Sequence, residues 1–423
     1  MSNSKKIGER KKNREPDTGR ARSRVPGIQS EPVPSGKYRK RKPKGGRASL
    51  GLMASLSAAL IVLSLILLPA VVHFDKSVSV NRLTYDRFGG GYEGFATDPS
   101  QSGELLPFGF GLVIQCLDNE VQVLNISGQV EYAIRVTVNQ PRVIADDRHA
   151  LLYDLGGTYY CLLSATGPVF EGRTDDSIQG ASRGDSGHVG LILDRYNTRG
   201  VLRVLDPEGN QIFEWISKKS ENSGYVVSSS FSLEGEFVDI SLMNTDGSNP
   251  RPVILRLTLT GEQPGDELLR LQPDIRAALP KLIHTADSLL WMTDGQAIFT
   301  YDVVDETTVL RYNFSSIHSL IGWGDHLAVV GVCPEREGVR LYLLSGEQAD
   351  LENGLPLQGD STVPMVSDQY LAIASGSQIY LLNRYNIERV RTLDVSEPVQ
   401  KMSLNSAGDI IYVTRSGVGL IEN

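Results

Sequence analysis

The sequence is poor in the residues that build disulfide and metal sites. Three cysteines, Cys116, Cys161 and Cys333, with no CxxC pair, are too few for a disulfide scaffold or a zinc site. Cys116 and Cys161 fall in neighbouring repeats, so the sequence allows either a bridge between them or buried free thiols. The six histidines stand singly. We therefore assign no catalytic, cofactor-binding or metal-ligating residue and expect no cofactor, nucleotide cofactors included.

Helical periodicity is scarce as well. Beyond residue 74, only Glu267 to Leu279 has the spacing of a short helix, which argues against an α/β fold. The chain contains 42 glycines and 20 prolines, and beyond residue 47 they are evenly spread. Such even punctuation is typical of many short strands joined by tight turns. The predicted class is all-β.

Acidic residues are few at the start of the chain and dominant afterwards. Residues 1–47 hold 16 Lys and Arg against four acids, a net charge of +12, and the remainder holds 26 bases against 46 acids, a net charge of −20. Low hydrophobicity and repeated proline predict a disordered tail over 1–47. Its basic run from Tyr38 to Lys42 could contact nucleic-acid phosphates, but anionic lipid explains it as well. We expect lipid contact and no nucleic acid.

One long apolar run separates the two charge regimes. The segment from Leu50 to Val72 contains no charged residue. A helix of this length can cross the roughly 30 Å hydrocarbon core. The run and the preceding tail exceed the usual lengths in a signal peptide, so an uncleaved signal anchor is favoured. We predict a single-pass transmembrane helix over 48–74. Because basic flanks stay in the cytoplasm, residues 77–423 are expected to be extracytoplasmic.

The remainder of the chain is a repeat. An alternating apolar strand, a turn rich in Asn, Asp, Ser and Gly, and a second strand recur about every 42 residues, preceded each time by another strand pair. Four strands per unit with this period are typical of propeller blades. We predict a β-propeller over 77–423 with seven or eight four-stranded blades, eight being favoured. The residues that precede the recurring turns are Leu124, Leu163, Leu205, Leu257, Tyr301, Leu344, Leu382 and Ile421.

The last repeat stops at Asn423, where its fourth strand should begin. The alternating segment 77–85, SVSVNRLTY, has no repeat of its own. Pairing it with the last blade would close the ring and remove an exposed sheet edge. We therefore predict that 77–85 is the closing strand.

Two short motifs imitate hydrolase signatures. Gly180 to Gly184 fits GxSxG, and Gly184 to Gly187 reads GDSG. The first needs a strand before it and a helix after it, and the second needs a suitably placed His and Asp; neither is evident. The carboxylates Asp146, Asp147, Asp175, Asp176 and Asp185 lack the spacing of a calcium loop. We interpret them as solvated turn residues.

The basic tail, the anchor, VSVNRL at 78–83 and YVVSSSFSLEGEFVDISLMNTDG at 225–247 carry a resemblance. The chain resembles an uncharacterised family of single-pass, membrane-anchored propellers of Gram-positive bacteria, a domain of unknown function distantly similar to quinoprotein-like and WD40-like repeats. The resemblance spans essentially the whole chain, but its motifs are structural and imply no catalytic residues.

Fold alone does not give function. The favoured hypothesis is a membrane-anchored extracytoplasmic binding or scaffold propeller, at the cell membrane, whose partner is a protein or a cell-envelope ligand. The alternatives are an enzyme with an unrecognised site on the central propeller face, and a sensor that acts through a membrane partner. An enzyme is the less favoured of these readings. The sequence leaves the ligand, the oligomeric state and the process open.

Overall fold

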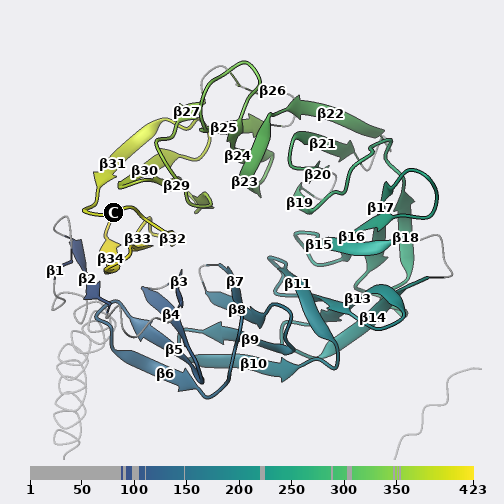
Figure 1. Ribbon diagram of the computed structural model, residues 1–423, viewed down its shortest axis with the longest axis horizontal. Coiled ribbons are helices and arrows are strands. Elements are labelled where there is room, and N and C mark those ends of the chain that lie inside the picture. Colours follow the sequence, from purple (N-terminus) through teal and green to yellow (C-terminus); the bar gives the residue numbers. More distant parts are fainter. Residues whose placement is uncertain are drawn as a thin grey trace, which may run out of the picture. The chain divides into compact units, whose positions relative to one another are not determined.

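Eight antiparallel sheets follow one another around a ring in the computed structural model (Figure 1). The structure describes residues 87–88, 92–97, 104–109, 111–146, 148–219, 224–286, 289–302, 307–345, 348–349, 351 and 354–423. All of them belong to one unit, Phe74–Asn423. The predicted all-β propeller is confirmed, and of the two blade numbers considered, eight is right.

The blades are numbered in chain order. Blade 1 has β3 (Glu104–Phe108), β4 (Leu112–Leu117), β5 (Glu120–Asn125) and β6 (Val130–Ile134). Blade 2 has β7 (Pro141–Ala145), β8 (His149–Asp154), β9 (Tyr159–Ser164) and β10 (Gly167–Arg173). Blade 3 has β11 (Ser177–Arg183), β12 (Val189–Asp194), β13 (Thr198–Leu205) and β14 (Gln211–Lys218). Blade 4 has β15 (Tyr225–Phe231), β16 (Phe237–Asn244), β17 (Arg251–Thr258) and β18 (Glu267–Leu271).

The second half of the ring has shorter strands. Blade 5 has β19 (Lys281–Ala286), β20 (Leu289–Thr293), β21 (Ala297–Asp302) and β22 (Thr307–Asn313). Blade 6 has β23 (Ser316–Trp323), β24 (His326–Val332), β25 (Arg340–Ser345), β26 (Gln348–Ala349) and β27 (Leu355–Pro356). Blade 7 has β28 (Met365–Val366), β29 (Tyr370–Ser375), β30 (Gln378–Asn383) and β31 (Arg389–Asp394). Blade 8 has β32 (Lys401–Leu404), β33 (Ile410–Val413) and β34 (Gly417–Ile421), with β2 (Tyr92–Ala96) and β1 (Arg87–Phe88).

The core lies between the blades. The second strands are buried over nearly their whole length and are largely apolar, as in VGLILD of β12 and YLAIAS of β29. Eight clusters of buried apolar residues result, one at each junction between consecutive blades. Each fully buried aliphatic side chain contributes about 1.5–3 kcal/mol. The predicted marker residues fall in the third strands, for example Leu124 in β5 and Leu382 in β30.

An N-terminal strand closes the ring, but it is not the predicted one. β2 pairs antiparallel with β34 as the fourth strand of blade 8, with Glu93 opposite Leu420 and Ala96 opposite Gly417 (Figure 1). Phe95 adds its side chain to the apolar cluster between blades 8 and 1. The prediction was right in kind and wrong in residues, since 92–96 takes this position; residues 77–85 lie outside the described ones.

The short helix predicted from Glu267 to Leu279 is wrong. Residues Glu267–Leu271 form β18, which pairs with β17, and no helix follows it. Pro273 removes a helical hydrogen-bond donor, and Ile275 and Leu279 are drawn into the core between blades 4 and 5. Helical spacing therefore arose from an edge strand followed by a connection with two buried side chains.

The predicted tail 1–47 and anchor 48–74 lie outside the described residues. Among the residues that the structure describes, no helix is both long and apolar enough to cross a membrane. The three cysteines are buried and free, so of the two possibilities left open for Cys116 and Cys161, free thiols are correct. Burial raises the pKa of each of these two thiols to about 12, which keeps them protonated and unreactive.

Candidate functional site

The ring has two ends that differ in their turns. Turns between second and third strands, with the connections between blades, form one end, here called the connection end. Turns between first and second strands, and between third and fourth strands, form the opposite end, here called the hairpin end. Such turns on a rigid scaffold are the usual location of binding residues.

The GxSxG-like motif lies on β11, an innermost strand of blade 3. Its Ser182 Oγ is 2.6 Å from Ser229 Oγ of blade 4, so the hydroxyl joins two blades. A turn and a strand, β12, follow it rather than a helix. The contact is structural, as the flanks predicted.

The GDSG-like motif forms the turn after β11. Ser186 Oγ and His188 Nδ1 are 2.8 Å apart within that turn, and His188 stacks on Phe231. Burial lowers the pKa of His188. No carboxylate bonds to the other ring nitrogen among the described residues, so the pair lacks the third group that orients the base in a serine triad.

The turn carboxylates bind backbone and arginine rather than a common cation. Asp146 Oδ1 accepts backbone hydrogen bonds from Arg148 and His149, and Arg183 pairs with its other oxygen. Asp176 pairs with Arg195 at 2.8 Å. Within the described ranges, no three His, Cys, Asp or Glu side chains are placed to hold a metal ion.

A buried ionic cluster joins blades 4 and 5. The Asp239 carboxylate accepts two bonds from Arg256, at 2.8 and 2.7 Å, and faces His284 Nε2 at 2.9 Å. Burial by itself would raise the pKa of Asp239, but the bonds from Arg256 and His284 outweigh it and hold that pKa below its usual range. Phe237 covers the cluster, with the Arg256 guanidinium 3.8 Å from its ring centre. The cluster of Asp239, Arg256 and His284 therefore links blade 4 to blade 5, and we call it the inter-blade clasp.

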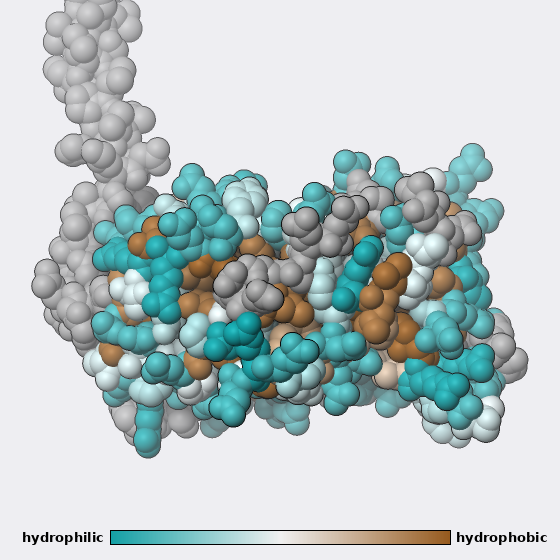
Figure 2. Space-filling model, turned by 90° about the horizontal axis from the view of Figure 1, so that it is seen from above, coloured by the Kyte–Doolittle hydropathy of each residue, from teal (hydrophilic) through white to brown (hydrophobic). Residues whose placement is uncertain are grey.

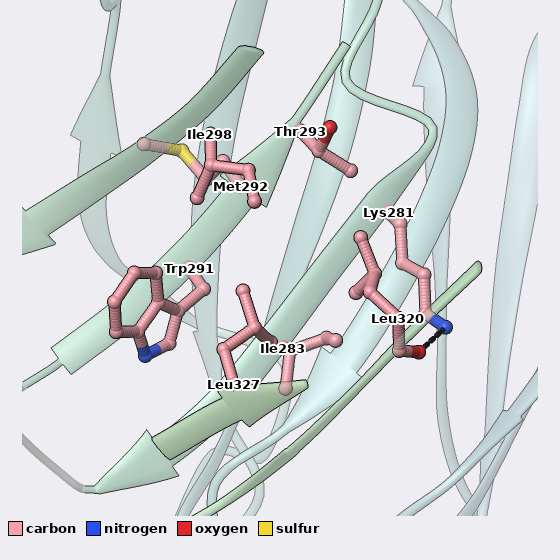
Figure 3. A pocket seen from close by; sticks show the side chains of 8 residues that line it. All are labelled: Lys281, Ile283, Trp291, Met292, Thr293, Ile298, Leu320 and Leu327. Carbon is pink, nitrogen blue, oxygen red and sulfur yellow. Dashed lines mark hydrogen bonds between the residues drawn. The ribbon is translucent and has the colours of Figure 1, made fainter. Parts of the chain in front are cut away.

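A narrow apolar gap lies between blades 5 and 6 (Figure 3). Trp291, Ile298 and Leu327 line it, and it is too narrow to hold a water molecule. At its edge Lys281 Nζ donates to the Leu320 carbonyl at 2.7 Å, drawn as a dashed line in Figure 3. Desolvation of the ammonium lowers the pKa of Lys281, although part of its chain remains exposed. The gap is a packing defect rather than a ligand site.

A polar cavity of about 310 Å³ opens at the connection end of blade 4. It is of the size that binds small ligands. The turn between β16 and β17 shapes it, and Asn244 Oδ1 fixes that turn by accepting the Asp246 backbone N–H at 2.7 Å. The lining, which we call the blade 4 cavity, consists of Asn244, Asp246, Gly247, Ser248, Asn249, Arg251, Val253 and Gln272.

Four of these side chains have free hydrogen-bonding groups. Ser248, Asn249, Arg251 and Gln272 make no side-chain hydrogen bond or ion pair within the described residues. They supply a hydroxyl, two amides and a guanidinium. Such a set suits a polar ligand with several acceptors and a negative group opposite Arg251.

Arg199 of blade 3 binds one of the lining residues, Asp246. Arg199 pairs through both terminal nitrogens with the Asp246 carboxylate, one bond being 2.7 Å long. The hydrogen bonds from Arg199 lower the pKa of Asp246 and so keep it ionised. Arg199 also lies 5.9 Å from the ring centre of Tyr225, which is half exposed. At this edge of the cavity the Asp246 carboxylate is therefore already paired with a cation, and the Tyr225 ring lies next to Arg199.

A tyrosine projects from the neighbouring turn of the same end. Tyr196 is 97% exposed, and Asn197 after it has φ of 65°. Arg195 holds the turn through Asp176 and Glu214, and Arg203 binds the same Glu214. A tight, ion-paired turn therefore presents to solvent a large side chain that has an apolar ring and a polar hydroxyl. Neither Tyr196 nor the cavity was found from the sequence, because turn residues carry no periodic signal.

Comparisons with known proteins extend the fold but not the chemistry. No curated protein matches the chain. Among solved structures it is similar to Sqt1 of Saccharomyces cerevisiae, at 11% identity over 78% of this chain and 98% of that one, with a TM-score of 0.54. It is also similar to BamB of Moraxella catarrhalis, at 15% identity over 77% and 95%, with a TM-score of 0.47.

At these identities the likeness shows the fold alone. The predicted resemblance to a propeller family of unknown function is supported in part. Residues 97–256, which run from the end of β2 through blades 1 to 3 and into β17, match the model of DUF5711, a family of unknown function.

Proposed function

We propose that the chain is a membrane-anchored, extracytoplasmic binding propeller whose partner, a protein or a cell-envelope component, docks on the connection end of blades 3 and 4. The blade 4 cavity carries this proposal, because free polar groups line it and two exposed tyrosines, Tyr225 and Tyr196, lie at the same end of the ring. Tyr and Arg, with Trp, are enriched among the residues that contribute most to binding at interfaces. The net charge of −20 beyond residue 47 disfavours anionic polymers as the main partner and favours a neutral or basic one with a local acidic group.

The docking surface is tested by co-purification. The full-length chain is crosslinked in cells and isolated beside Arg251→Ala, Tyr225→Ala and the double variant. We expect a partner with the wild-type chain and its loss, on the order of tenfold or more, in the double variant. Val169→Ala on the outer strand β10, 45% exposed, is the matched control. Equal recovery with all variants would rule out this surface.

The orientation is tested separately with cysteines, since the three native thiols are buried. A membrane-impermeant maleimide applied to intact cells should label Tyr196→Cys and leave Ser35→Cys in the tail unlabelled until the cells are lysed. Labelling of Ser35→Cys alone would place the ring in the cytoplasm and contradict the proposed location.

A further inference from the structure

The turn between β30 and β31 of blade 7 departs from its counterparts in other blades. In blades 1, 3 and 4 the corresponding turns contain a glycine at positive φ, namely Gly128, Gly209 and Gly265. Blade 7 has Ile387 in the left-handed region, with φ of 48°. A β-branched residue in that region is strained, and such strain collects at functional sites.

The same turn is nevertheless rigid. Asn383 Oδ1 accepts the Tyr385 backbone N–H at 2.9 Å, and Asn386 Oδ1 accepts that of Glu388 at 3.0 Å. Backbone bonds from Asn383 to Glu388 and from Ile387 to Asn383 close it. The turn is held in one conformation despite its strained residue.

What the turn presents is an aromatic group. Tyr385 is 54% exposed. His326 packs edge-on against it with ring centres 5.6 Å apart, and Trp323 stacks on His326 at 5.9 Å and 7°. Arg384 fixes the tyrosine by donating to its hydroxyl at 2.7 Å and to the Ser367 carbonyl at 2.8 Å. These side chains come from turns at the hairpin end of blades 6 and 7.

Two arginines follow this turn on the outer strand of blade 7. Arg389 and Arg391 on β31 are exposed and form no ion pair within the described part of the chain. Arg389 lies 5.0 Å from the ring centre of Tyr380, which orients its guanidinium. Residues 384–391 carry three arginines and one acid, Glu388, a net charge of +2 in a body that carries −20.

Other arginines of the chain show which kind of ligand Arg389 and Arg391 suit. Arg199, Arg203 and Arg256 each bind a carboxylate of this chain through a terminal nitrogen. The exposed guanidinium groups of Arg389 and Arg391 have the same arrangement of donors, which matches a carboxylate of a binding partner. Val390 between them is 54% exposed and supplies an apolar contact.

We propose that this surface, which we call the blade 7 surface and define as Trp323, His326, Arg384, Tyr385, Arg389, Val390 and Arg391, binds an acidic segment of a protein partner that also carries apolar side chains. Arg389 and Arg391 bind its carboxylates, and Tyr385 and Val390 contact its apolar residues. The site lies at the end of the ring opposite the blade 4 cavity. Taken with the proposed docking at the blade 4 cavity, on which this point rests, the ring has a binding surface at each end.

The probes are a fluorescein-labelled peptide of alternating glutamate and leucine and its glutamine–leucine counterpart. Binding to the full-length chain in detergent is followed by fluorescence anisotropy. We expect the acidic peptide to bind at least tenfold more tightly than the neutral one, and more weakly as salt rises. Arg389→Glu with Arg391→Glu should remove that preference, and Tyr385→Ala should weaken binding of both peptides.

The matched control is Arg135→Glu with Arg148→Glu, an equal charge change at two exposed arginines of blades 1 and 2. It should leave the preference intact, and thermal melting checks that each variant is folded. Equal binding of the two peptides, or equal loss in the control pair, overturns the proposal. Dimers seen by sedimentation that disappear in Arg389→Glu with Arg391→Glu would also overturn it, because the occupant would then be a second copy of this chain.

Discussion

Blades 3 and 4 differ from blades 6 and 7 in how continuous and regular their strands are. Blade 4 has four continuous strands, with eight residues in both β16 and β17. Blade 6 splits its outer position between β26 and β27, which pair with opposite ends of β25, and blade 7 begins with the two-residue β28. Blade 4 of the regular pair holds the buried Asp239–Arg256 ion pair, which reaches His284 of blade 5, whereas blades 6 and 7 leave aromatic and basic side chains at the surface.

The outer contacts show the same contrast. In the regular part, an aromatic residue of one outer strand packs on the turn glycine of the next blade: Phe170 on Gly209 and Phe213 on Gly265. At the junction of blades 6 and 7 the turn has Ile387 and an exposed Tyr385 instead. The packed glycine turns of the regular blades thus contribute to stability, whereas the exposed side chains of the blade 7 turn form a surface available for binding.

The largest expected effect comes from breaking the inter-blade clasp, which links blade 4 to blade 5. Asp239→Asn leaves Arg256 buried without its charge partner and should lower the free energy of unfolding by about 3–5 kcal/mol, measured by urea denaturation. Asp246→Asn, which removes a solvent-exposed carboxylate, should cost far less. Similar losses in the two variants would mean that the cluster does not hold blades 4 and 5 together.

Ring closure gives the next effect. A Cβ added at Gly94 would lie 2.0 Å from the Val418 carbonyl oxygen, across the β2–β34 pair that completes blade 8. Gly94→Ala should therefore destabilise the whole ring by about 1–3 kcal/mol and lower its melting temperature. Gly338→Ala, with φ of 81° and no atom near its Cβ, controls for backbone strain alone. An unchanged melting temperature for Gly94→Ala would argue against closure through β2.

Acid should weaken the clasp. Because the pKa of Asp239 is lowered in the folded state, its contribution is complete above the unfolded value of about 3.9 and is lost as the pH falls through the folded value. Wild-type unfolding free energy should drop more steeply below about pH 4 than that of Asp239→Asn. Parallel pH profiles for the two proteins would contradict the assigned cause.

The smallest expected change in stability distinguishes the glycine turns of the regular blades from the Ile387 turn of blade 7. Gly209→Ala places a Cβ 2.5 Å from the Phe170 ring and should cost about 1–3 kcal/mol. Ile387→Gly relieves about 1–2 kcal/mol of backbone strain and loses part of an apolar contact, so its net effect should stay within about 1 kcal/mol. Denaturation curves of both variants decide this. A large loss for Ile387→Gly would make that turn a stability element like the others.

Much of the architecture could be predicted because it repeats. The apolar strands and the Asn, Asp and Gly turns placed Leu124, Leu205 and Leu382 in third strands, because the same strand–turn–strand pattern recurs once in each blade. The closing strand was predicted in kind but set at 77–85, because β2 (YEGFA) is short and contains a glycine, which hides its pattern. The helix at Glu267–Leu279 was wrong because pairing with β17 overrode local spacing.

The sites could not be predicted in the same way. The blade 4 cavity depends on Arg199 reaching Asp246 across 47 positions, and the blade 7 surface on His326 meeting Tyr385 from another blade. Such meetings depend on which turns the ring brings together. Sequence spacing records the turns but not their neighbours.

The most direct test of the account is site-specific photocrosslinking in living cells. A photoreactive amino acid replaces Tyr196 at the connection end or Val169 on the outer strand of blade 2, in the full-length chain. The account predicts a discrete adduct from position 196 that disappears when Arg251→Ala and Tyr225→Ala are added, and none from position 169. Adducts of equal yield from both positions, or an adduct at 196 that survives both substitutions, would contradict a binding surface on blades 3 and 4.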